Sequence, residues 1–172
     1  MTGCSTWAAA AAGKLITERD VRLVIVGKPS ADTERLARQL SLSERVQFTH
    51  GLADAEFSDL VGTAQVAVVP SLYEGFSLPA VEHMASGTPL VASRTGALPE
   101  VAGDAAVLVT PGDSEELAAV LRRLLDSPAE RAALSERALA RVRERFAWPA
   151  VARATAERYR AAIEANTAEG PV

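Results

Sequence analysis

The stretch that most constrains the fold spans residues 66–93 and reads VAVVPSLYEGFSLPAVEHMASGTPLVAS. Its apolar residues 66–69 predict a buried strand, residues 71–77 a polar turn, residues 78–86 a helix and residues 90–92 a second buried strand. Two buried strands that are joined through a helix form a parallel β-α-β unit. The chain is therefore expected to be an α/β protein with a parallel sheet.

The turn before the predicted helix is suited to bind an anion. Pro79 favours the first turn of a helix, because its ring fixes a helical φ and its missing N–H is not needed there. The backbone N–H groups of Gly75, Phe76, Ser77 and Leu78 would then point out of the helix start, where the helix dipole adds about half a positive charge. A glycine in this turn also lets a ligand approach the backbone closely.

Two carboxylates flank these four residues, Glu74 in the turn and Glu82 in the predicted helix. A carboxylate repels an anion, but it accepts hydrogen bonds from the paired hydroxyls of a ribose or a hexose. An anion site beside two such acceptors indicates a sugar nucleotide as ligand. The alternative is that Glu74 is only a turn residue and that Glu82 lies on a solvated helix face.

Glu74 and Glu82 have seven residues between them, and this segment resembles the E-x7-E signature of retaining glycosyltransferases of family 4, which have the GT-B fold. The segment TGALPEV at residues 95–101 is similar to the GxxPE segment of that family, and the resemblance covers about residues 21–160. It implies a Rossmann-like, doubly wound parallel sheet with helices on both faces, which is the C-terminal half of a GT-B fold. It also implies that Glu74 holds sugar hydroxyls, Glu82 the ribose and the amides of residues 75–78 the diphosphate.

The resemblance implies further donor-binding residues at other strand ends. Gly51 and Leu52 would line the nucleotide base, although Leu52 could instead pack against Phe57 as a helix staple. Thr95 and Gly96 follow another predicted strand, and ligands of open α/β sheets bind at such carboxyl ends. No metal and no other cofactor is expected, because the chain has no Asp-x-Asp motif and the amides and helix end would take the metal's role.

The resemblance also implies a longer enzyme than this chain provides. GT-B enzymes bind the donor in the C-terminal domain and the acceptor in the N-terminal one, and only the C-terminal domain has a counterpart here. Even its first strand, with the Arg and Lys that follow, has no counterpart before Val21. That strand is central in the doubly wound order, so the strands at residues 21–26 and 66–69 would lose their shared neighbour. We expect these two strands to pair directly or to be completed by another chain, with possible self-association through the exposed edges.

The 172 residues provide one domain. Residues 1–20 are expected to be an irregular or helical remnant, residues 21–165 the nucleotide-sugar-binding domain and residues 166–172 a flexible tail. A net charge of −4, with Arg and Lys dispersed among acids, argues against a nucleic-acid partner. A single cysteine, no signal peptide and no long apolar run predict a cytoplasmic protein. Peripheral membrane contact would need parts that this chain lacks.

Two functions remain open from the sequence. The first is the donor-binding domain of a retaining glycosyltransferase, which moves a hexose from a nucleoside diphosphate sugar to an acceptor sugar, lipid or small molecule, with Glu74 as the catalytic candidate. The isolated chain is then expected to be inactive, because the acceptor domain is missing. The second is a non-catalytic remnant or a nucleotide-binding interaction module. A sugar-nucleotide epimerase of the same architecture is a third option, but that family lacks the E-x7-E segment.

Overall fold

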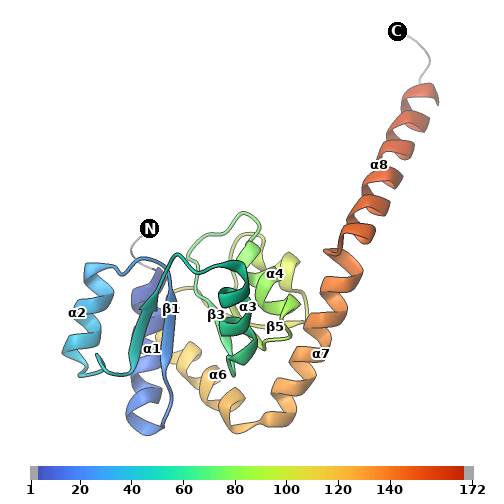
Figure 1. Ribbon diagram of the computed structural model, residues 1–172. Coiled ribbons are helices and arrows are strands. Elements are labelled where there is room, and N and C mark those ends of the chain that lie inside the picture. Colours follow the sequence, from blue (N-terminus) through green and yellow to red (C-terminus); the bar gives the residue numbers. More distant parts are fainter. Residues whose placement is uncertain (1–3, 169–172) are drawn as a thin grey trace.

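The computed structural model of the chain describes residues 4–168 (Figure 1). Helices and strands alternate along most of this length, as the β-α-β pattern of residues 66–93 predicts. In chain order the elements are α1 (Cys4–Glu18), β1 (Leu23–Val26), α2 (Ala31–Gln39), β2 (Val46–Thr49), α3 (Asp54–Thr63), β3 (Ala67–Val69), α4 (Leu78–Ala85), β4 (Leu90–Ser93), α5 (Leu98–Ala102), β5 (Ala106–Val109), α6 (Ser114–Asp126), α7 (Pro128–Arg145) and α8 (Trp148–Ala168).

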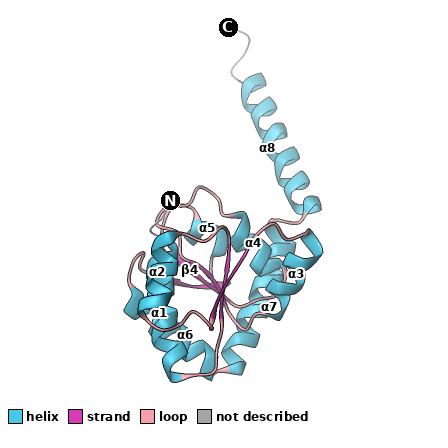
Figure 2. Cartoon of the chain, turned by 60° about the vertical axis from the view of Figure 1, so that its left-hand side comes forward, coloured by secondary structure: helices cyan, strands magenta, loops and turns pink. Residues whose placement is uncertain are grey.

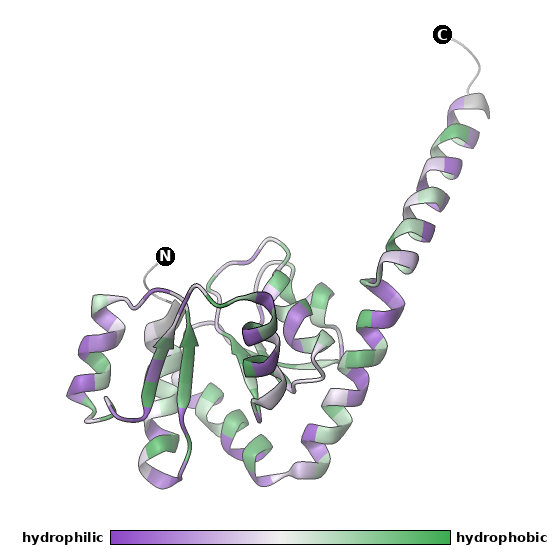
Figure 3. Cartoon of the chain, viewed as in Figure 1, coloured by the Kyte–Doolittle hydropathy of each residue, from purple (hydrophilic) through white to green (hydrophobic). Residues whose placement is uncertain are grey.

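All the strands pair in parallel, but they form two separate sheets, β1-β2 and β3-β4-β5. Placed side by side, the two sheets follow the doubly wound order in which strand 1 would lie between β1 and β3. The Rossmann-like class is thereby confirmed, and within residues 4–168 no strand lies between β1 and β3. Figure 3 shows β1 and β2 as apolar along most of their length, although their residues are only half-buried or exposed.

The direct pairing of β1 with β3, one of the two outcomes expected from the sequence, was wrong for the described residues. One reason is that Trp7 of α1 lies at the carboxyl end of β3, where its Nε1 donates a hydrogen bond of 3.2 Å to the carbonyl oxygen of Pro70. The N–H of Ala67 donates to the carbonyl oxygen of Pro89 just before β4, and because backbone groups alternate along a strand, the carbonyl groups of Val68 and Pro70 point toward the side where strand 1 would lie. The indole thus occupies part of the free edge of β3.

Helices cover both faces of the three-stranded sheet (Figure 2). Along β4, Val91 packs with α1 and α6, whereas Leu90 and Ala92 pack with α4, α5 and α7. This split follows from the alternation of side chains along a strand. Met84 of α4, which is fully buried, lies in the second cluster.

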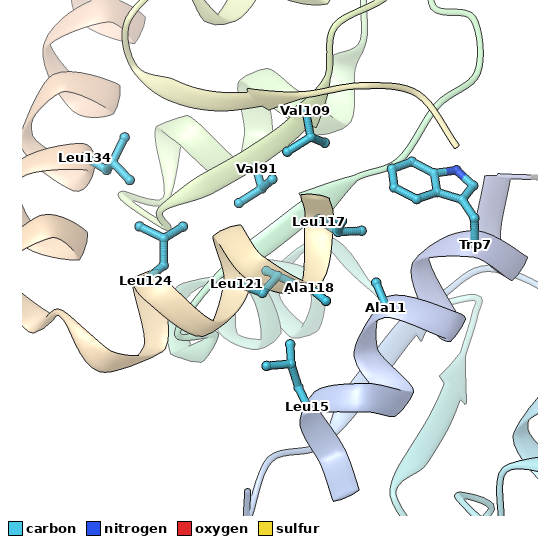
Figure 4. Close-up of a cluster of buried hydrophobic side chains, with 10 residues drawn as sticks. All are labelled: Trp7, Ala11, Leu15, Val91, Val109, Leu117, Ala118, Leu121, Leu124 and Leu134. Carbon is cyan, nitrogen blue, oxygen red and sulfur yellow. The ribbon is translucent and has the colours of Figure 1, made fainter. Parts of the chain in front are cut away.

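Residues 1–20 were expected to be an irregular or helical remnant; residues 4–18 are helical, and this helix, α1, is part of the hydrophobic core. Its residues Trp7, Ala11 and Leu15 pack against residues of α6, including Leu117 and Leu121 (Figure 4). Ion pairs also join the two helices, among them Glu18 with Arg122 at 3.0 Å. Alanines dominate the buried side of α1, so its apolar pattern is weak in the sequence although the contact with α6 is close.

Helix α8 extends away from the rest of the molecule (Figure 1). It leaves Trp148 84% exposed, with Tyr159 and Ile163 also exposed along it. Within residues 4–168, no helix combines the length and the apolar composition that a membrane-spanning segment needs. The cytoplasmic location stays a prediction. Residues 166–168, expected in the tail, belong to α8, and residues 169–172 lie outside the described residues.

Candidate functional site

The turn between β3 and α4 presents a group of open backbone N–H groups. Helix α4 begins at Leu78 with Pro79 in its first turn, as the sequence predicts. Ser77, just before it, has a φ of 75°, which is a left-handed conformation. Within the described residues, the N–H groups of Gly75, Phe76, Ser77 and Leu78 donate no hydrogen bond to the protein. These four donors at a helix N-terminus are available to an anion.

Glu74 is held in place at the start of this group. Its carboxylate is half-buried and accepts a hydrogen bond of 2.9 Å from the Ser71 hydroxyl through Oε2. Its backbone oxygen accepts a second hydrogen bond, of 3.0 Å, from the N–H of Ala97. The other carboxylate oxygen, Oε1, has no hydrogen-bond partner among the described residues and can accept from a ligand hydroxyl.

The loop after β4 supports the turn. Thr95 Oγ1 donates a hydrogen bond of 3.1 Å to the carbonyl oxygen of Leu72. Gly96 has a φ of 52°, and a Cβ at this position would lie 2.0 Å from the backbone oxygen of Glu74. Only glycine therefore fits here. Thr95 and Gly96 therefore hold the turn through contacts with its backbone. The sequence had placed them only at the carboxyl edge of the sheet.

Glu82 lies in the second turn of α4 and is exposed. Its carboxylate has no hydrogen bond or ion pair within the described residues, so it is free to accept from a ligand. Together the open amides and the carboxylates of Glu74 and Glu82 can bind a phosphate next to hydroxyl groups.

Gly51 and Leu52 lie in a different loop from the open amides and the two carboxylates. They follow β2, and Gly51 has a φ of 69° in the turn that leads to α3. No hydrogen bond between described residues joins them to the turn before α4. Helix α3 does reach α4, because the ring of Phe57 lies 6.4 Å from that of His83 between centroids. The assignment of Gly51 and Leu52 to the nucleotide base stays a prediction.

A pocket of about 200 Å³ opens beside the turn, and part of its lining was not foreseen from the sequence. The residues that line it come from the turn, from α5 with the residue before it, and from the C-terminal end of α7: Gly75, Phe76, Ala97, Glu100, Val101, Arg145 and Phe146. No role was assigned from the sequence to the arginines of the C-terminal helices. The regular spacing of Arg137, Arg141 and Arg145 was the only signal that could have identified one side of α7.

Two buried hydroxyls near the carboxyl edge lack partners. Ser77 Oγ and Ser93 Oγ make no hydrogen bond with the described residues, although both side chains are buried. Among the described residues, no group of three or more metal-ligating side chains converges.

Comparisons with known proteins agree on one family. The sequence profile of Glycosyl transferases group 1 matches residues 8–141. The MMP alpha-(1->4)-mannosyltransferase of Mycolicibacterium hassiacum is 52% identical over an alignment of 158 positions, which covers 89% of this chain and 38% of that protein. The chain thus spans less than half the length of this relative.

Solved structures give the same result. The C-terminal domain of the glycosyl transferase group 1 family protein LpcC from Francisella tularensis superposes with a TM-score of 0.75 at 26% identity, covering 84% of this chain and 80% of that one. Anabaena HepE, solved in complex with UDP, gives a TM-score of 0.77 at 24% identity, over 91% of this chain and 44% of HepE. The fold is that of the C-terminal half of a GT-B glycosyltransferase, and the chain belongs to the family of glycosyl transferases group 1.

Proposed function

We propose that this chain is the donor-binding domain of a retaining glycosyltransferase that moves a hexose from a nucleoside diphosphate sugar to an acceptor. The observation that carries the proposal is the set of four open N–H groups at residues 75–78, with the carboxylates of Glu74 and Glu82 on either side. Few other ligands combine a phosphate with two sets of neighbouring hydroxyls in so small a space.

In this proposal the turn has two tasks. The amides of residues 75–78 and the start of α4 bind the diphosphate, and they stabilise the negative charge that develops on it as the glycosidic bond breaks. Glu74 orients the hexose through its hydroxyls, helped by the Ser71 hydrogen bond that fixes its carboxylate. Glu82 accepts hydrogen bonds from the ribose. No metal has a role in this scheme, because the amides and the helix end supply the positive charge.

The acceptor site lies outside this chain in the proposal. The chain covers 38% of the mannosyltransferase relative, and a two-domain enzyme closes over its substrates from both sides. The donor is expected to bind to the isolated chain, whereas transfer to an acceptor, whether sugar, lipid or small molecule, requires the remainder of such an enzyme. HepE, a protein of the same fold that was solved with UDP, supports a nucleotide as the ligand.

Calorimetric titration of the chain with UDP, GDP, ADP and their sugars tests the proposal. We expect saturable binding of one nucleotide, with the affinity lowered about tenfold in Glu82→Ala, because a charged hydrogen bond to the ribose is lost. Glu136→Ala is the matched control, since Glu136 is an exposed carboxylate on α7 that has no partner among the described residues and lies outside the turn. If none of the nucleotides binds, the chain is a non-catalytic remnant, and the proposal fails for it.

A further inference from the structure

Three arginines lie at four-residue intervals on one face of α7, and two of them bind the backbone of the α5 region. Arg137 Nε donates to the carbonyl oxygen of Asp104 at 3.0 Å. Arg141, one turn later, donates through Nε to the carbonyl oxygen of Val101 at 2.7 Å and through Nη2 to that of Glu100. These bonds satisfy carbonyl groups at and just after the C-terminal end of α5. Arg137 and Arg141 therefore have a structural role.

Arg145 is the third arginine of this series, and within the described residues it donates no hydrogen bond to a backbone carbonyl. It lies one further turn along the same face, where it lines the 200 Å³ pocket together with Glu100. Within the described residues, its guanidinium makes no ion pair or hydrogen bond, and neither does the carboxylate of Glu100. A free donor group and a free acceptor group therefore border the same small cavity.

The remaining lining of the pocket is mostly apolar. Phe76 is 47% exposed, and its ring packs edge-on against that of Phe146, with centroids 5.9 Å apart and an interplanar angle of 76°. Ala97 and Val101 add small apolar surface, and Gly75 leaves its backbone accessible. Aromatic surface with a few placed polar groups is the usual composition of a small-ligand site.

We infer that this pocket binds a pyranose ring, with Arg145 and Glu100 as its hydrogen-bonding residues. The inference rests on the proposed function and names residues for the sugar beside the turn. A pyranose has an apolar ring face that can pack on Phe76 and hydroxyls at its rim, for which the guanidinium supplies donors and the carboxylate acceptors. The opposite charges of Arg145 and Glu100 favour a neutral, hydroxyl-rich group over a second phosphate. The ring can come from the nucleotide sugar or from a free saccharide that serves as acceptor.

The test follows the side-chain Nε–H signal of Arg145 by NMR in the whole chain. The chain is titrated separately with UDP and GDP, with UDP-glucose and GDP-mannose, and with free glucose and mannose. A signal that moves with a nucleotide sugar, but not with the matching nucleoside diphosphate, supports the inference and identifies the donor as the source of the ring. A signal that moves only with a free sugar supports it with the acceptor as the source.

Substitutions separate binding from structure. Arg145→Met is expected to weaken binding of that sugar ligand about tenfold and to leave the thermal midpoint unchanged, because the guanidinium has no partner in the protein. Arg145→Lys should restore part of the affinity. Arg143→Met, which removes an exposed arginine from another face of α7, should change neither quantity.

An Arg145 signal that none of these ligands moves, or an Arg145→Met chain with unchanged sugar affinity, overturns the inference. Failure of the proposed function is distinct from this result. In that case no nucleotide or nucleotide sugar binds, while a shift caused by a free sugar would still support the pocket.

Discussion

Gly96 shows how one residue without a side chain positions the turn. Its left-handed φ of 52° and its contact with the backbone of Glu74 allow the hydrogen bond from Ala97 N–H to Glu74 O. The sequence indicated Glu74 and Gly75 because a glycine and carboxylates around a helix start have a chemical meaning without a structure, whereas Gly96 followed from the family resemblance and its place after a strand. The sequence did not identify Arg145, because a surface arginine acquires a role only through what lies opposite it, here Glu100 and Phe76.

Gly96→Ala is predicted to lower the free energy of unfolding by about 2 kcal/mol or more, since a left-handed alanine costs about 1–2 kcal/mol and its Cβ would collide with the Glu74 oxygen. Urea denaturation measures this change. Gly62→Ala is the control, because Gly62 lies in α3 with open space where its Cβ would be, and alanine there should raise stability by up to about 1 kcal/mol. Equal effects of the two substitutions would contradict the role of Gly96.

At the scale of elements, the strand and helix pattern of residues 66–93 was predicted almost to the residue, because buried strands and a proline-started helix are local signals. The role of α1 was not, because nothing in the sequence of residues 4–18 indicates a contact with α6, about a hundred residues later. The contact between α3 and α4 likewise depends on tertiary packing. There His83 of α4 lies beside Phe57, and its Nδ1 is buried without a hydrogen-bond partner among the described residues.

Burial lowers the pKa of His83 below the ordinary value of 6.5, so the folded chain favours the neutral imidazole. The unfolded chain then binds more protons in the range just below pH 6.5, and protonation favours unfolding. We predict that the contribution of His83 to the free energy of unfolding is constant above pH 6.5. It falls as the pH drops below 6.5, until the pH reaches the lowered pKa of His83.

Urea denaturation between pH 7.5 and about pH 5 measures this dependence, the lower limit being chosen to stay above the ordinary carboxylate range. His83→Gln should flatten the slope, whereas His50→Gln, at an exposed position after β2, should keep it. A slope that survives in His83→Gln would assign the dependence to another group.

At the scale of the whole molecule, the division of the sheet is the main feature. The absence of pairing between β1 and β3 leaves the outward backbone groups of Val24 and Val26 without a ladder partner among the described residues. Sequence reasoning predicted the missing strand from the doubly wound order. It could not predict whether the gap closes, because that depends on how α1 packs against both sheets.

Free strand edges favour association between chains. We predict that the weight-average mass of the chain in analytical ultracentrifugation rises with concentration, and that Val26→Lys reduces the rise, because Val26 is 49% exposed at the end of β1 and a charge there opposes strand pairing. Val151→Lys, at an exposed position on α8, serves as control for added charge. A chain that stays monomeric throughout would show that its edges are protected.

The central claim is that the amides at residues 75–78 bind the diphosphate of a nucleotide sugar, and the backbone N–H signals of these residues test it most directly. Titration with UDP and GDP, and with uridine and guanosine as phosphate-free controls, should shift these signals and slow their hydrogen exchange only when the diphosphate is present. That result would assign the open amides of the α4 start to the donor. Saturable binding of a nucleoside diphosphate that leaves all four amides unchanged would contradict the account.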